Sequence, residues 1–156
     1  MEQMSSIVRT ITKFLFALIF LFGGYIILHG HLTPGGGFQG GAIIATLFAL
    51  YFVAFAAKRW KKAFLSAMES SGLLIFIGTG LLGLVSGYFM FNFLGGEGSF
   101  LFGQPIDPAN YTSPPFLSSG TVAVMNLAVG LEVIAALTLI IITMGLFAFF
   151  NKEVGE

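Results

Sequence analysis

The longest apolar stretch of the chain is VAVMNLAVGLEVIAALTLIIITMGLFAFF, residues 122–150. A bilayer core of about 30 Å needs about 20 helical residues to cross it, so this stretch is long enough to span a membrane. Three further stretches qualify, over residues 8–28, 38–57 and 72–93. We therefore predict an all-α integral membrane protein in which residues 1–156 form a single domain with four transmembrane helices.

The composition agrees with a membrane protein. Hydrophobic residues make up 56% of the chain and charged residues 9%, against about 25% charged residues in a soluble domain. A net charge of zero argues against nucleic-acid binding. There is no cysteine, which excludes disulfides and Cys-ligated zinc or iron–sulfur clusters in this chain. We expect no bound cofactor, and in a redox complex the electrons would have to pass through other subunits.

The basic residues predict how the chain is oriented. With four crossings, one side of the membrane receives all seven Lys and Arg side chains: Arg9, Lys13, Lys58, Arg59, Lys61, Lys62 and Lys152. The positive-inside rule makes this side the cytoplasm, so both termini are expected there and the loop 94–120 outside. We expect the first span to be retained, since no A-x-A-like cleavage site follows Leu28. The basic cluster 58–62 is typical of an anchor on anionic lipid, with docking of a cytoplasmic partner as the alternative.

Residues 29–41, HGHLTPGGGFQGG, are the most distinctive short segment. They match G-x-G-x-x-G, but a dinucleotide site needs a preceding strand and an acidic residue about 20 positions later, and both are missing. Pro34 suits the entry to a helix. The glycines form two G-x-x-x-G pairs, Gly36 with Gly40 and Gly37 with Gly41. Such pairs let a neighbouring helix approach closely, so we expect the start of the second span to be buried against protein.

The third span carries a similar stripe at Gly80, Gly83 and Gly87. The spacing follows the helical repeat, which predicts a second close-packing face. Four helices with two such faces indicate one part of a larger helical assembly.

Residues 31–41, HLTPGGGFQGG, resemble the signature of the MrpB/MnhB family, the B subunits of multisubunit sodium/proton antiporters. The family also supplies subunits to the membrane arms of related hydrogenases and sulfane-sulfur reductases. Chain length and the four-span topology extend the likeness. The resemblance implies a small non-catalytic subunit in the cytoplasmic membrane, packed among other small and large antiporter-type subunits and helping to form a path for Na⁺ or H⁺. The alternative is a structural scaffold that joins antiporter subunits to a hydrogenase or sulfur reductase arm. Carried over by position, the residues expected to matter are Pro34, Gly35, Gly36, Gly37 and Phe38, with Gly40 and Gly41 serving packing.

Glu132 is the one acidic residue inside the four predicted spans. A carboxylate in the bilayer centre costs about 2.5–3.5 kcal/mol on insertion scales, so an intramembrane acid is a functional candidate. Its helical neighbours are small: Ala128, Ala135 and Ala136. We expect Glu132 to face the complex as a proton or sodium site. If the hydrocarbon region ends at Phe150, however, Glu132 lies near the outer interface and is simply solvated. Asn126 is expected to cap or to hydrogen-bond locally.

His29 and His31 lie at the outward end of the first span. One interpretation makes them polar interfacial residues near a turn. The other makes them proton acceptors at the mouth of an ion path, because histidine titrates near neutral pH. Two histidines without a further ligand are weak evidence for a metal, and H-E-x-x-H and G-x-S-x-G are both missing. We predict no metal site and no catalytic residue.

Overall fold

The computed structural model describes residues 4–31, 35–55, 61–85, 87–94 and 120–154. The described residues form four helices and no strand. The helices are α1 (Ser6–Leu28), α2 (Gly36–Phe55), α3 (Lys62–Val85) and α4 (Thr121–Val154). Each is long and apolar enough to cross a membrane, α4 over Thr121–Phe147. The prediction of an all-α protein with four membrane-spanning helices is confirmed.

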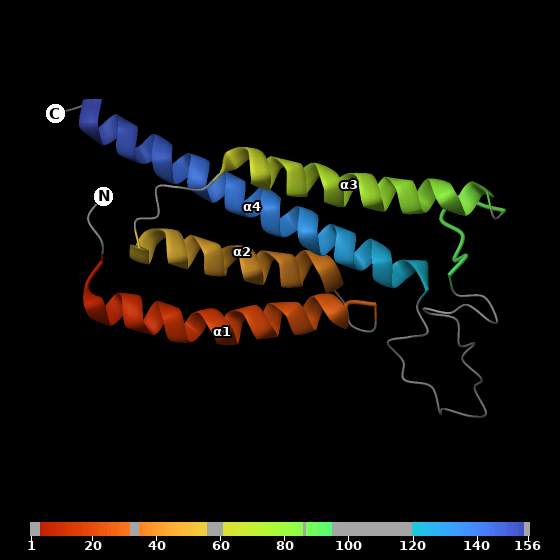
Figure 1. Ribbon diagram of the computed structural model, residues 1–156, viewed down its shortest axis with the longest axis horizontal. Coiled ribbons are helices and arrows are strands. Elements are labelled where there is room, and N and C mark those ends of the chain that lie inside the picture. The colour runs from red at the N-terminus through yellow and green to blue at the C-terminus, as the bar shows by residue number, and fades with distance from the viewer. Residues whose placement is uncertain (1–3, 32–34, 56–60, 86, 95–119, 155–156) are drawn as a thin grey trace.

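The helices pack in the order α1, α2, α4, α3 (Figure 1). Helix α2 packs on both α1 and α4, and α3 packs on α4. Helix α1 begins and α4 ends at the same end of the protein. Which end faces the cytoplasm stays a prediction.

Helix α3 begins ten residues before the expected start at residue 72 and ends at Val85 rather than at residue 93. The reason for the early start is local: no Gly or Pro stands between Lys62 and Gly72, so nothing stops the helix there. The earlier start places Glu69 inside a candidate span. That Glu132 is the one acid within the membrane stays a prediction, with Glu69 as a second candidate.

The glycine pairs of α2 let it approach two helices of its own chain. A Cβ added to Gly40 would lie 2.7 Å from the Gly23 carbonyl oxygen on α1. One added to Gly41 would lie 2.9 Å from the Val133 Cβ on α4. Both distances are too short for a side chain, so α2 needs glycine on both sides. The glycines of its first turns are buried as expected, against helices of the same chain, while Phe38 is exposed.

The glycine stripe at the end of α3 is covered by the chain itself. After Val85 the backbone reverses through Gly87 and Met90, both with positive φ (142° and 59°). The Met90 amide then donates to the Gly80 carbonyl at 3.2 Å. A Cβ on Gly83 would lie 2.9 Å from the carbonyl oxygen of Tyr88. Gly80 and Gly83 therefore do not form a face for another subunit, contrary to the prediction.

Candidate functional site

The side chain of Asn126 joins three helices at one end of the protein. Its Oδ1 accepts a hydrogen bond of 2.6 Å from the Gly37 amide in the first turn of α2. Its Nδ2 donates to the Ile27 carbonyl in the last turn of α1. Asn126 itself belongs to α4. One amide therefore satisfies a free donor at the start of α2 and a carbonyl at the end of α1, groups that helix ends leave without internal partners.

Three glycines make room for this side chain. A Cβ added at Gly30, Gly36 or Gly37 would run into atoms of Asn126. The backbone also requires glycine at two positions, since φ is 100° at Gly35 and 36° at Gly36, a region that other residues rarely adopt. Asn126, 89 residues after Gly37, thus accounts for glycine at positions 30, 36 and 37.

Asn126 was not recognised as important from the sequence, where only a local role was expected. The amide instead binds across helices. The available signal was its place inside a long apolar stretch, because polar amides in membrane helices tend to hydrogen-bond across helices. Sequence spacing could not identify its partner.

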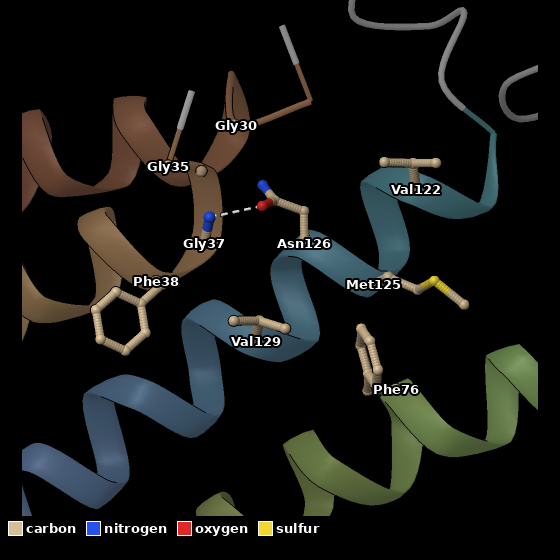
Figure 2. Close-up of a pocket in the computed structure, with 10 residues that line it drawn as sticks. Gly30, Gly35, Gly37, Phe38, Phe76, Val122, Met125, Asn126 and Val129 are labelled. Carbon is tan, nitrogen blue, oxygen red and sulfur yellow. Dashed lines mark hydrogen bonds between the residues drawn. The ribbon is translucent and has the colours of Figure 1, made fainter. Parts of the chain in front are cut away.

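An open pocket of about 350 Å³ lies beside this junction. Figure 2 shows Phe38 of α2 on one side, Phe76 of α3 on the other, and α4 between them. The lining residues are Gly30, Gly35, Gly36, Gly37, Phe38, Phe76, Val122, Met125, Asn126 and Val129. The walls are thus mainly apolar, and four motif residues line one end.

Glu132 lies where α3 and α4 approach most closely. A Cβ added to Gly72 would lie 2.7 Å from the Ala128 carbonyl oxygen and 2.9 Å from the Glu132 Cβ. Gly72 is ten residues from Lys62 and thirteen from Val85, which places Glu132 opposite the middle of α3. The expected small neighbours are confirmed in part, since Ala128 and Ala135 are buried. The side chain of Glu132 is half-buried.

Glu69 is a second half-buried carboxylate at this helix contact. It precedes Gly72 by one helical turn, on the same face of α3. Neither Glu69 nor Glu132 has a hydrogen bond or an ion pair within the described ranges. The sequence could not reveal Glu69 as a candidate once the third span was taken to begin at residue 72.

The two histidines lie apart from the carboxylates. His29 follows α1, with its Nδ1 at 3.1 Å from the Tyr25 carbonyl and its ring stacked on the Tyr25 ring at 4.2 Å. Both ring nitrogens of His31 are buried without a hydrogen-bond partner among the described residues. The histidines closely follow Ile27, whose carbonyl binds Asn126. Glu132 lies about 9 Å further along α4 than Asn126. The structure does not bring the histidines and Glu132 into one cluster.

Within the described residues, no group of three His, Asp or Glu side chains could hold a metal ion. Pro34, most of the basic cluster 58–62 and most of the loop 94–120 lie outside the described residues. Of the remaining motif residues, Gly36, Gly37, Gly40 and Gly41 are buried, while Gly35 and Phe38 are exposed.

Comparison with known proteins identifies the family. A model for a domain related to the MnhB subunit of the Na⁺/H⁺ antiporter matches residues 7–139. This chain belongs to the MnhB family. The matched range includes the glycine motif, Asn126, Glu69 and Glu132.

Individual MnhB-related proteins are similar over different lengths. An uncharacterised protein of Methanocaldococcus jannaschii is 36% identical over 125 residues, which cover 78% of this chain and 45% of that protein. A protein of Staphylococcus saprophyticus named as an antiporter subunit, mnhB2, is 39% identical over 59 residues, 38% of this chain and 42% of that one.

A solved structure shares the fold of this MnhB chain. A chain of the membrane-bound sulfane sulfur reductase, an archaeal respiratory membrane complex, superposes with a TM-score of 0.76 at 34% identity. The match covers 90% of this chain and 57% of that chain. This protein thus spans about half the length of the Methanocaldococcus and reductase chains.

Proposed function

We propose that this MnhB-family protein is a non-catalytic subunit of a multisubunit complex that moves Na⁺ or H⁺ across the cytoplasmic membrane, with Glu132 lining the ion route. The observation that carries this proposal is the placement of Glu132. Its half-buried carboxylate lies opposite the middle of α3, and no described residue pairs with it. An unpaired acid at such a depth is costly in lipid and typical of ion and proton pathways.

The family supports the multisubunit setting. The matching family model describes a subunit of an antiporter, and the structural relative comes from a respiratory membrane complex. Companions would be antiporter-type membrane subunits, joined in some complexes by sulfur reductase or hydrogenase subunits. The basic residues favour an orientation with both termini in the cytoplasm.

His29 and His31 have a secondary place in this proposal. They follow the last turn of α1, which Asn126 ties to α2 and α4. From there they would serve as proton-accepting groups at the outward mouth of the route.

Exchange measured in membrane vesicles tests the role of Glu132. The complex containing Glu132→Gln is compared with wild type and with Glu132→Asp, which keeps an acid. We expect Gln to lower Na⁺-dependent proton exchange at least about tenfold, while Asp retains part of it. The amount of chain in the purified complex is measured alongside, so that lost assembly is not mistaken for lost transport.

A scaffold role makes the opposite prediction. If Glu132→Gln assembles and exchanges at the wild-type rate, Glu132 carries no ions and the chain only joins other subunits. The purified complex also tests the broader proposal: a chain that purifies alone from mild detergent is not a subunit.

A further inference from the structure

The pocket beside Asn126 and the two carboxylates lie along the same helices, α3 and α4, and we call this line of residues, with the pocket at one end, the groove. Helix α4 forms the floor, and α2 and α3 provide the walls through Phe38 and Phe76 (Figure 2). Both walls pack on α4. The groove therefore opens on one face of the helical layer.

Helical spacing places the carboxylates further along this groove. Glu132 comes three residues after Val129 on the floor, and residues three apart are neighbours on a helix surface. Glu69 comes seven residues, or two turns, before Phe76 on the wall. Gly72 lies between Glu69 and Phe76 in the chain. A Cβ added to Gly72 would lie 2.9 Å from the Glu132 Cβ. The two acids thus flank one contact between floor and wall.

The charge of this groove limits what can occupy it. The end of the groove at the pocket is apolar, with Met125 and Val129 in the pocket lining. The other end carries the carboxylates of Glu69 and Glu132, which no described residue neutralises. Lipid acyl chains would satisfy the apolar part but offer no donor to the acids, and unpaired charges in the membrane interior are costly. A helix with apolar side chains and one cationic side chain would satisfy both parts.

We propose that this groove receives a transmembrane helix of a neighbouring subunit whose Lys, Arg or His side chain faces Glu132 and Glu69. The inference rests on the proposed function in one respect, that the chain works inside a complex. It does not require ions to pass through Glu132.

The protein has no cysteine, so an introduced thiol is the single thiol of this chain. In the purified complex, Met125→Cys in the groove is modified with a maleimide–benzophenone and illuminated, and adducts are mapped by mass spectrometry. Leu21→Cys, on the exposed side of α1 at 69% exposure, is the matched control for labelling. We expect the Met125 adducts to map to a transmembrane segment of another subunit that contains Lys, Arg or His.

Neutral variants then test the charge. In the background of Glu69→Gln with Glu132→Gln, the Met125 adduct should fall at least about fivefold relative to the amount of chain, while the Leu21 adducts stay unchanged. Each single Gln variant is measured as well, in case the double variant is not incorporated. Adducts only with lipid, with a second copy of this chain, or with a segment without a basic residue would overturn the proposal. So would a yield that does not respond to loss of the carboxylates.

These outcomes are separate from those of the transport test. If the Met125→Cys complex with both carboxylates intact exchanges normally but gives no adduct with another subunit, the docking proposal alone is overturned. If the Met125 adduct forms and falls in the Gln variants as expected, while Glu132→Gln exchanges at the wild-type rate, the docking proposal stands and the ion route through Glu132 is removed.

Discussion

The Asn126 Oδ1 accepts a hydrogen bond from the Gly37 amide at 2.6 Å. The other end of the same amide donates to the Ile27 carbonyl. Two segments that are almost 100 residues from Asn126 are thereby tied to α4 by one side chain.

Replacing Asn126 by Leu should lower the stability of the protein by about 1–2 kcal/mol, because the Gly37 amide loses its partner and the Ile27 carbonyl keeps only the Gly30 amide at 3.3 Å. Thermal unfolding in mild detergent measures the change. Val122→Leu, at a half-exposed position of the same helix, is the control and should unfold like wild type. Equal unfolding of the Asn126→Leu and Val122→Leu variants would show that the junction contributes nothing.

The fold and the candidate site differ in how far the sequence predicts them. Apolar length predicts the number of helices, because crossing a bilayer sets a minimum length. The two glycine pairs correctly predict close helix approach at Gly40 and Gly41. The spacing does not identify which helices approach. The predicted stripe of the third span packs at Gly83 against the segment that follows it in the chain.

The candidate site depends on contacts between distant segments, which spacing does not encode. The partner of Asn126 is known only once α4 lies beside the turn between α1 and α2. Glu69 was missed for a different reason. Hydropathy identifies only the apolar part of a helix. Helix α3 itself begins at Lys62, ten residues before the predicted start at residue 72.

Two glycines near the contact of α1 and α2 should respond in opposite ways to alanine. At Gly40 the new methyl group would lie 2.7 Å from the Gly23 carbonyl oxygen, and backbone cannot move aside cheaply. At Gly24 no atom lies within 4 Å among the described residues, so alanine gains helix propensity of up to about 1 kcal/mol. We expect Gly40→Ala to reduce the yield and thermal stability of folded protein, and Gly24→Ala to leave both unchanged or higher. Similar stabilities of the two variants would contradict the packing described for α2.

Two buried threonines of the described residues also form a matched pair. The Thr79 hydroxyl donates to the Ile75 carbonyl at 2.7 Å. Thr138 is 1% exposed, and its hydroxyl has no hydrogen-bond partner among the described residues. An unsatisfied buried polar group is destabilising by about 1–3 kcal/mol, so Thr138→Val should be neutral or stabilising in a detergent unfolding measurement. Thr79→Val should not stabilise the protein. A clear loss on Thr138→Val would instead reveal a buried water or another partner for that hydroxyl.

The contact between Gly72 and Glu132 links packing to the proposed transport. An alanine methyl at Gly72 would lie 2.7 Å from the Ala128 carbonyl oxygen and 2.9 Å from the Glu132 Cβ, which forces α3 away from α4 at the carboxylate. Gly78→Ala on the same helix is the control, because no described atom lies within 4 Å of that position. We expect Gly72→Ala to lower Na⁺-dependent proton exchange in vesicles several-fold, and Gly78→Ala to exchange at the wild-type rate with equal amounts of assembled chain. If both variants exchanged normally, the position of Glu132 against α3 would be irrelevant to transport, and the route would have to lie elsewhere in the complex.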